Sequence, residues 1–454
     1  MTSDKNNRLV APCVIACPAE IDVPRYIGYV EQGKFAEADA VVRESIPLPV
    51  ACGLICYRPC EPWCRRGIME QPVAINAIKR AATEHRNQEL RSLGKERRWQ
   101  GPIATATGKR VAIIGGGPAG LTAAYYLSRR RGHSVTLYEA MPELGGQLRY
   151  GLPEYKAPRE EIQREIAQIV AVQVDVKTGA RIEDIERVLG EFDAVLVAVG
   201  QTLAKKVAGL DAPAASDFLR DVNLGRPWPV GERVVIIGGN NVAVDAARCA
   251  IRLGAKDVRV LFDGARGEAQ AYDFEIAAAG EEGVHFIEKR PDATMPSADL
   301  VLVAAGEETG VAARWGLATT SRGGLDVHRE SLMTSRPGLF AAGDAVTGPD
   351  SIVEAMAQGK KAAVAIDRFL GGDGDISESF GPAPGSEMEM PEHLAKQGKP
   401  VVAMPLIQLE TRKKSFALVE KGYTKEEAVA EARRCVRCDL WRSKIPEVWN
   451  KRKG

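Results

Sequence analysis

The sequence Arg-Val-Ala-Ile-Ile-Gly-Gly-Gly-Pro-Ala-Gly-Leu-Thr-Ala-Ala-Tyr-Tyr-Leu, residues 110–127, decides the fold. An apolar run leads into the glycines Gly115, Gly117 and Gly120, and an alanine-rich segment follows. This order predicts a buried strand, a tight phosphate-binding turn and a helix. The first glycine permits the turn, the second lets the backbone approach a pyrophosphate, and the third lets helix and strand pack closely. Glu139 ends the next apolar segment and would accept hydrogen bonds from an adenosine ribose.

A second stretch, residues 233–263, repeats this layout. Its VVIIGGN corresponds to VAIIGGG in the first stretch, and its VRVLFD corresponds to SVTLYE. Each unit leads to a strand that ends in glycine, at Ala194–Gly200 and Leu300–Gly306, and these strands should return the chain between domains. The repeat predicts an α/β fold with two nested Rossmann-like dinucleotide-binding domains. Helical patterns in residues 1–100, such as Val23–Glu44 and Ala74–Leu93, predict a small α-helical domain before them.

Two further segments, Glu143–Pro153 and Gly338–Asp344, are those that FAD enzymes of this layout use. Asp344 would hold the ribityl or pyrophosphate region, and the helix after Ser351 would point its positive end at the pyrimidine edge of the flavin ring. A flavin fold that has lost its flavin is the alternative. The predicted FAD residues are Gly115, Gly117, Pro118, Ala119, Gly120, Glu139, Gly146, Gln147, Leu148, Gly343, Asp344, Ser351, Ile352 and Val353.

The second glycine loop predicts a site for NAD(H), formed by Gly238, Asn240, Asn241, Val242 and Asp263. Asn240 replaces the middle glycine; Asn accepts positive φ more readily than most residues, but its side chain would crowd a pyrophosphate. Asp263 suits a free ribose 2′-hydroxyl and repels a 2′-phosphate, so NADH is expected over NADPH. The unit is short for a nicotinamide domain, and a degenerate, non-binding domain is the alternative.

Eight of the nine cysteines crowd into two regions, and such spacing suggests a metal centre. Two zinc ions are one possibility. Pro59 and Pro62 interrupt any helix there, so loops around a redox-active cluster are favoured beside a flavin domain. Cys249 stands alone and predicts packing, and the lack of a paired thiol beside the flavin disfavours a disulfide reductase. The predicted metal ligands are Cys13, Cys17, Cys52, Cys56, Cys60, Cys64, Cys435 and Cys438.

Together the motifs resemble the family of the glutamate synthase small (beta) subunit. This family includes the flavin half of dihydropyrimidine dehydrogenase and the large subunit of NADH-dependent ferredoxin:NADP oxidoreductase. The resemblance covers most of residues 11–372, and it implies an N-terminal domain that binds two 4Fe-4S clusters. The matching pieces are Cys13-x3-Cys17-Pro18, Pro47–Gly67, IIGGGPAGLTAAYYL, LGGQLRYGLPEY and LFAAGDAVTGPDSIVEAMAQGKKAAVAI.

The resemblance also implies a ligand set. The family's first Cys-x2-Cys pair is missing before Cys13, but EEAVAEARRCVRC, residues 426–438, looks like that pair and its helix moved to the C-terminal side. The family position for a Gln or Glu ligand matches Lys79, which cannot bind iron while protonated. Cys52 is the substitute, unless it is only a small buried residue. One cluster would then use Cys13, Cys64, Cys435 and Cys438, and the other Cys17, Cys56, Cys60 and Cys52.

The predicted function is an electron-transfer subunit in which hydride passes between nicotinamide and flavin, and single electrons pass to the clusters. A ferredoxin-like subunit and a further redox enzyme subunit are the expected partners, by analogy; a flavin- and cluster-bearing adaptor is the alternative. A formal charge of +1 favours neither nucleic acid nor membrane, and the lack of an apolar signal segment favours the cytoplasm. Residues 129–131, three arginines, are expected to be a solvated face, or else a docking site for an acidic partner.

The predicted domain boundaries follow from these motifs. They are an α-helical 4Fe-4S domain at 1–100, an FAD-binding domain in two parts at 109–230 and 307–372, a shortened NAD-binding domain at 231–306, an exposed linker at 373–400, and a tail at 401–454 whose cysteine pair returns to the 4Fe-4S domain.

Overall fold

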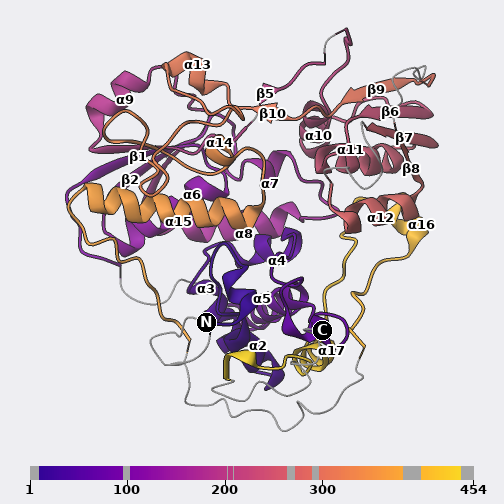
Figure 1. Ribbon diagram of the computed structural model, residues 1–454, viewed down its shortest axis with the longest axis horizontal. Coiled ribbons are helices and arrows are strands. Elements are labelled where there is room, and N and C mark those ends of the chain that lie inside the picture. Colours follow the sequence, from indigo (N-terminus) through magenta and orange to yellow (C-terminus); the bar gives the residue numbers. More distant parts are fainter. Residues whose placement is uncertain are drawn as a thin grey trace, which may run out of the picture.

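The computed structural model describes residues 10–95, 103–262 without 202 and 208, 271–288, 296–381 and 400–440. Figure 1 shows a helical part at the base and two α/β parts side by side above it. The segment after residue 400, drawn in yellow, starts beside the helical part, reaches the right-hand α/β part and returns to the helical part. The chain therefore visits the base twice, near its beginning and again after both α/β units.

Residues 10–95, the first segment of the helical part, contain five α-helices. The predicted helical stretch from Val23 to Glu44 is two helices, because Gly33 takes a φ of 74° and turns the chain between them. The stretch predicted from Ala74 to Leu93 is confirmed as one helix, α5. The bounds are α1 Pro12–Ile15, α2 Val23–Glu31, α3 Phe35–Arg43, α4 Pro49–Ile55 and α5 Ile75–Ser92.

The left-hand unit contains a parallel five-stranded sheet in the order β11-β4-β1-β2-β3. Apart from the exposed Arg110 at the start of β1, its central strands β1 and β4 are apolar and buried, as expected when helices cover both faces. The strands are β1 Arg110–Ile114, β2 Ser134–Tyr138, β3 Val174–Lys177, β4 Ala194–Val197 and β11 Leu339–Ala341. The helices are α6 Pro118–Tyr125, α7 Gln147–Tyr150, α8 Arg159–Val170, α9 Ile185–Glu191, α13 Val311–Trp315, α14 Asp344–Thr347 and α15 Ile352–Phe369.

The right-hand unit contains a parallel four-stranded sheet in the order β8-β7-β6-β9. Its central strand pairs with the next strand and with the last, as β1 pairs with β2 and β4. In the sequence, the whole right-hand unit is inserted between β4 and β11 of the first sheet. The predicted nested Rossmann-like fold class is therefore confirmed. The elements are β6 Arg233–Ile237, β7 Asp257–Phe262, β8 Val284–Glu288, β9 Leu300–Val303, α10 Ala215–Asn223, α11 Asn241–Arg252 and α12 Asp273–Glu282.

Two short strands, β5 Leu203–Ala204 and β10 Glu307–Glu308, pair antiparallel where the chain enters and leaves the right-hand unit. The tail, residues 400–440, then connects this unit with the helical part. Its α16, Leu409–Arg412, packs on α12, and its α17, Lys425–Ala432, packs on α2 and α5. The tail thus bridges two parts that the sheets alone do not join.

The three arginines at residues 129–131 do not form the solvated face that we expected. Arg129 is 2% exposed, and its Nε donates to Glu378 at 3.3 Å. Arg131 forms an ion pair with Asp367 at 2.8 Å. The Arg129–Glu378 pair, together with contacts of Arg131 to Asp373 and to the Asp375 oxygen, both at 2.9 Å, holds residues 373–378 beside the arginines, so the described start of the predicted exposed linker is anchored. Residues 382–399 of that linker lie outside the described residues.

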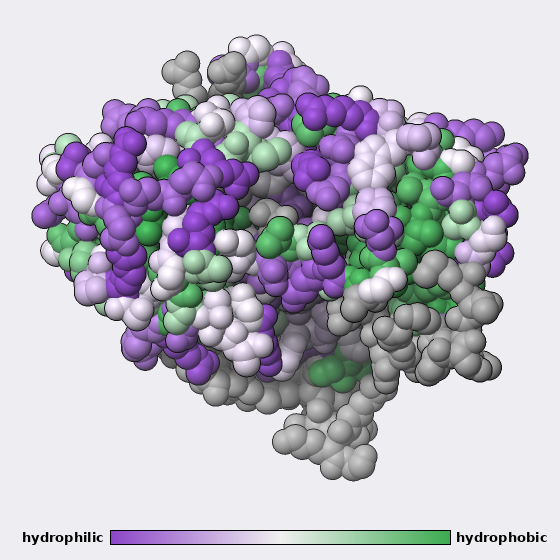
Figure 2. All heavy atoms as spheres, turned by 90° about the horizontal axis from the view of Figure 1, so that it is seen from above, coloured by the Kyte–Doolittle hydropathy of each residue, from purple (hydrophilic) through white to green (hydrophobic). Residues whose placement is uncertain are grey.

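Figure 2 shows the face seen from above, which is largely hydrophilic, with a more hydrophobic area at the right. In the described parts of the chain, no helix has the length and apolar character that a membrane crossing needs.

Candidate cofactor and cluster sites

The first glycine loop is held by close backbone contacts. A Cβ on Gly115, whose φ is 112°, would lie 2.3 Å from the Ala198 carbonyl oxygen, and one on Gly120 would lie 2.0 Å from the Gly115 oxygen. Both positions therefore require glycine. Gly117 differs, because the nearest atom to its added Cβ is the Gly146 Cα at 3.9 Å. The space in front of the first amides of α6 is open, which suits an approaching phosphate.

Glu139 is buried, and its carboxylate is hydrogen-bonded to the first glycine loop. Its Oε2 accepts from the Gly116 amide and its Oε1 from the Met141 amide, both at 2.8 Å. The sequence suggested only a ribose contact, so the structural part of its role was missed. Both oxygens keep a free lone pair that a ribose hydroxyl could use.

Two predicted segments from elsewhere in the sequence meet at the start of α6. The Gly145 amide donates to the Gly116 oxygen at 2.8 Å, which lays the Gly146–Leu148 segment against the glycine loop. A Cβ on Gly343 would approach the Ala119 Cβ to 2.9 Å. Leu148 is buried, whereas Gln147 is exposed. The predicted FAD residues thus lie around one helix start.

The start of α15 lies beside this region. Gly359 of α15 crosses α6 so closely that a Cβ on it would lie 2.4 Å from the Ala119 oxygen. The Ser351 hydroxyl caps α15 by accepting from the Glu354 amide at 3.3 Å, and Ile352 and Val353 are buried in its first turn. Two helix N-termini therefore face one region, an arrangement that fits the pyrophosphate and the ring edge of FAD.

Asp344 begins α14 between these two helix starts. Burial, and then the nearby charge of Asp350, raise the pKa of Asp344 to about 7. A hydroxyl donor from a ligand would stabilise its charged form and lower that pKa again. Its position between α6 and α15 is therefore compatible with the predicted contact to the middle of the cofactor.

The second glycine loop has the same turn as the first, but its central position is Asn240 where the first loop has Gly117. A Cβ on Gly238 would lie 2.3 Å from the Ala304 oxygen, the same distance that separates a Cβ on Gly115 from the Ala198 oxygen. Asn240 has a φ of −89°, so this position does not need a left-handed backbone. Its Oδ1 accepts from the Ala243 amide at 3.0 Å, and its Nδ2 donates to the Ala304 oxygen at 3.0 Å. Asn240 caps its own helix and uses an amide that a phosphate could bind.

Two other predicted residues of this site, Asn241 and Val242, open α11 directly after Asn240. The Asn241 Oδ1 accepts from the Tyr272 amide at 3.1 Å, a contact that the sequence did not indicate. Val242 is half-buried on α11. Asp263, the basis of the NADH prediction, lies outside the described residues.

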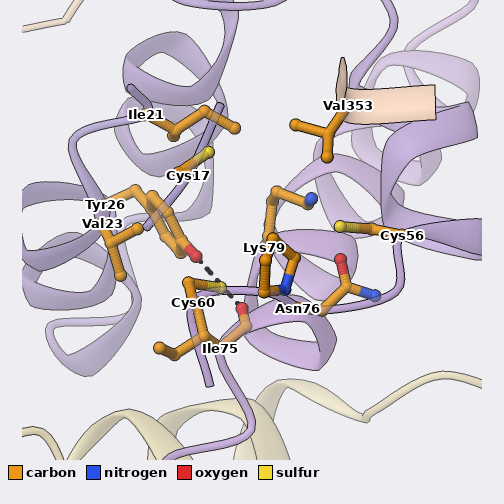
Figure 3. Close-up of a pocket in the computed structure, with 11 residues that line it drawn as sticks. Cys17, Ile21, Val23, Tyr26, Cys56, Cys60, Ile75, Asn76, Lys79 and Val353 are labelled. Atoms are coloured by element: carbon orange, nitrogen blue, oxygen red, sulfur yellow. Dashed lines mark hydrogen bonds between the residues drawn. The ribbon is translucent and has the colours of Figure 1, made fainter. Parts of the chain in front are cut away.

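Three predicted ligands, Cys17, Cys56 and Cys60, line one pocket of the helical part (Figure 3). Lys79 projects into the same pocket, and its Nζ donates to the buried Cys52 Sγ at 2.9 Å. Hydrogen bonding with Cys52 lowers the pKa of Cys56 to about 6, against the effect of burial. Cys52 contacts Cys56 and Lys79 but is not among the residues that line the pocket.

The remaining four predicted ligands form a second group. Burial raises the pKa of Cys13, and the charges of Cys435, Cys438 and Cys64 raise it further, so these thiols are neighbours. The tail is fixed here by Glu431, whose Oε1 accepts from the Ala74 amide at 2.8 Å. The structure therefore brings cysteines from both ends of the sequence together.

Neither thiol group has the form of a single-ion site. Over the described ranges, no three His, Cys, Asp or Glu side chains converge closely enough to hold one metal ion. Cysteines that bind a cluster stand farther apart, since the iron and sulfide core lies between them. Cys249 is fully buried in α11, where it packs in the core of the second unit.

Comparison with known proteins agrees with this arrangement. Residues 109–359 match the family model of pyridine nucleotide-disulphide oxidoreductases, and residues 8–90 match dihydropyrimidine dehydrogenase domain II, 4Fe-4S cluster. The beta subunit of NADP(+)-dependent formate dehydrogenase from Moorella thermoacetica is 33% identical, with 95% of this chain and 71% of that protein covered.

Two other relatives are similar at nearly the same level. The beta subunit of NADPH-Fe(3+) oxidoreductase from Geobacter sulfurreducens is 31% identical over 95% of this chain and 75% of that protein. The small chain of NADPH glutamate synthase from Mycobacterium tuberculosis is 30% identical over 79% of this chain and 86% of that protein. The family predicted from the motifs is confirmed: the chain belongs to the pyridine nucleotide-disulphide oxidoreductases, in the group that carries an N-terminal 4Fe-4S domain and includes the glutamate synthase small chain.

Proposed function

We propose that the chain is an FAD- and 4Fe-4S-containing electron-transfer subunit that exchanges hydride with NAD(H) and single electrons with the clusters of a partner subunit. One observation carries the proposal. Val353, in the first turn of α15 at the predicted flavin edge, also lines the pocket of Cys17, Cys56 and Cys60. The predicted flavin and one predicted cluster therefore adjoin, as electron transfer between them requires.

The residues of the chain bind and orient the groups. The first amides of α6 would hold the pyrophosphate, Glu139 keeps the glycine loop in shape, and the start of α15 would favour negative charge on the flavin ring. Bound FAD supplies the step from two-electron hydride transfer to one-electron transfer. No side chain needs to act as acid, base or nucleophile, and we assign no catalytic residue.

We propose an order in which the two clusters carry electrons away from the flavin. Because α4, which leads into Cys56, packs on α15, the group with Cys17, Cys56 and Cys60 is next to the predicted flavin. The group of Cys13, Cys64, Cys435 and Cys438 lies beside α17 and would pass electrons outward. Replacing both Cys435 and Cys438 by Ser should remove about four irons per chain and leave the flavin bound. Cys249→Ala is the matched control, and unchanged iron content would refute the shared site.

The nicotinamide proposal is tested by anaerobic titration of the flavin-loaded protein with NADH and, separately, NADPH. We expect the flavin absorbance to bleach with NADH first, because Asp263 would repel a 2′-phosphate. Two relatives are named for NADPH and one for NADP(+), so faster bleaching by NADPH would overturn the preference and keep the function.

An adaptor with a non-binding second unit is the other candidate, and the capping role of Asn240 favours it. No bleaching by either dinucleotide, in protein that dithionite still reduces, would support the adaptor and refute the enzyme. We propose a ferredoxin-like subunit and a further redox enzyme subunit as partners in the cytoplasm. Proteins that copurify with the chain would identify them.

A further inference from the structure

Four side chains form a stack between the helical part and the second unit. The Tyr57 and Tyr272 rings lie 5.4 Å apart at 12°, and the Tyr272 and Phe274 rings lie 5.6 Å apart at 6°. The Arg58 guanidinium carbon lies 4.9 Å from the centre of the Phe274 ring. We call these four residues the interdomain clasp. Two come from the loop after α4 and two from the start of α12.

One side of the clasp is tied to the second glycine loop. The Ala271 amide donates to the Gly239 oxygen at 2.9 Å, and the Tyr272 amide donates to Asn241. The segment that carries Tyr272 and Phe274 therefore cannot shift without moving the loop that would bind the nicotinamide dinucleotide.

The other side of the clasp is tied to the tail and to the loop after α4 that carries Cys56 and Cys60, which we call the cluster loop. Arg58 has a φ of 67°, an uncommon conformation for a residue with a side chain. Its amide contacts the Cys56 sulfur at 3.4 Å, and its guanidinium pairs with Glu420 of the tail at 3.3 Å. These contacts on both sides of the residue hold a backbone that would otherwise relax.

The clasp also lies close to the predicted flavin edge. Burial, followed by the charge of Asp350, raises the pKa of Tyr272 to about 12, so Asp350 is a neighbour of the stack. Asp350 directly precedes Ser351, the cap of α15. The stack is therefore where the second glycine loop, the cluster loop and the start of α15 meet.

Phe274 is 40% exposed, so hydrophobic burial alone does not account for an aromatic ring there. The rings of Tyr57 and Phe274 both stack on Tyr272, which leaves little of that ring for a ligand. Tyr272 and Phe274 therefore have the properties of a spacer between domains. Aromatic rings hold a fixed distance better than flexible side chains do.

We propose that Tyr272 and Phe274 are positioning residues: by fixing the second glycine loop relative to the flavin-binding unit, the clasp sets how fast bound nicotinamide delivers its hydride. The inference rests on the proposed function. A small error in the distance between donor and acceptor slows such a transfer strongly, whereas binding of the remote parts of the dinucleotide is hardly affected.

The test compares Tyr272→Leu and Phe274→Leu with wild type and Tyr272→Phe, in the full chain with flavin and clusters bound. Anaerobic stopped-flow mixing with whichever dinucleotide reduces the wild type should show the limiting rate of flavin reduction lowered by about tenfold or more in the Leu variants. The dinucleotide concentration for half-maximal rate should change by less than about threefold. Tyr272→Phe keeps the ring and should restore the rate.

Two controls separate the clasp from general damage. Phe369→Leu alters a comparably exposed ring, 46% exposed at the far end of α15, and should leave the rate unchanged. Dithionite should reduce flavin and clusters equally in all variants. Unchanged rates in both Leu variants, or an effect confined to dinucleotide affinity, would overturn the inference. If no dinucleotide reduces the wild type, the proposed function itself fails, which is a different result.

Discussion

The two glycine loops of this chain are alike in their turns and different at one position. Gly115 and Gly238 both have a left-handed backbone, and both abut the carbonyl of the strand that returns the chain, at Ala198 and at Ala304. At the centre, Gly117 leaves the helix start open, whereas Asn240 bonds to it. The first amides of α6 are thus open to a ligand, whereas in α11 the Ala243 amide is already hydrogen-bonded to Asn240.

The difference shows that a Rossmann-like unit can keep its fold while its ligand site changes. Turn and packing depend on the glycines that touch backbone, and these are present in both units. The central position would face a bound ligand and is free of close backbone contacts at Gly117, so a substitution there is compatible with folding. Asn240 even stabilises its helix, since Asn is among the best capping residues. Substitutions at the two central positions therefore test the comparison directly.

The largest effect is expected from Gly117→Asn, which copies the second loop into the first. The new side chain would cap α6 and fill the space beside Gly146, so the first amides of α6 would no longer be open to a phosphate. We expect the bound flavin per chain to fall by about tenfold or more. The ratio of flavin to protein absorbance after purification measures it.

Gly190→Asn is the matched control for this change. Gly190 is exposed in α9, with nothing within 4 Å of an added Cβ. Flavin retained by Gly117→Asn would show that the open centre of the first loop is not what binds the cofactor.

The reverse change, Asn240→Gly, should have a smaller effect in the opposite direction. It frees the Ala243 amide and the space in front of α11, at the loss of a few tenths of a kcal/mol of capping energy. We expect nicotinamide affinity to rise by about fivefold, equal to about 1 kcal/mol. Isothermal titration with NADH and NADPH measures it, with Asn240→Asp as the variant that should weaken binding through charge repulsion.

The smallest effect concerns Asp344 in flavin-free protein. Its pKa of about 7 in the folded chain lies above its ordinary value, so the native state holds this proton more tightly than the unfolded state. Its contribution to stability is full at low pH and is lost as the pH rises from about 4 to about 7. Asp344→Asn should therefore raise the melting temperature by about 2–4 °C above that window and not below it. Asp350→Asn, which removes the second cause of the shift, should give part of this gain.

The fold could be predicted because its signals are local. A strand, a glycine turn and a helix occupy adjacent residues, and the pattern occurs twice. The break at Gly33 was missed because a glycine inside an amphipathic stretch is compatible with a continuous helix. The N-cap role of Asn240 was within reach, since Asn followed by an apolar helical pattern is a known start signal.

The remaining errors concern contacts between distant residues. Arg129 looks solvated in sequence because its partner, Glu378, lies far along the chain in a segment of low apolar content. Lys79 could be excluded as a ligand from its charge, but its bond to Cys52 depends on how α4 and α5 pack. The clasp likewise joins Tyr57 to Tyr272, and neither residue has a neighbour in sequence that indicates the other.

The position of Cys435 and Cys438 beside Cys13 and Cys64 also has a consequence for biosynthesis. The helical part precedes both α/β units in the chain, and domains generally fold in the order in which they leave the ribosome. This part, however, lacks α17 and two of its thiols until both α/β units have been made. Iron delivered to that group during translation would find an incomplete site, so a cluster bound by all four thiols could be completed only after residues 435–438 have been made. A cluster in this group would thus report that synthesis went through to the tail.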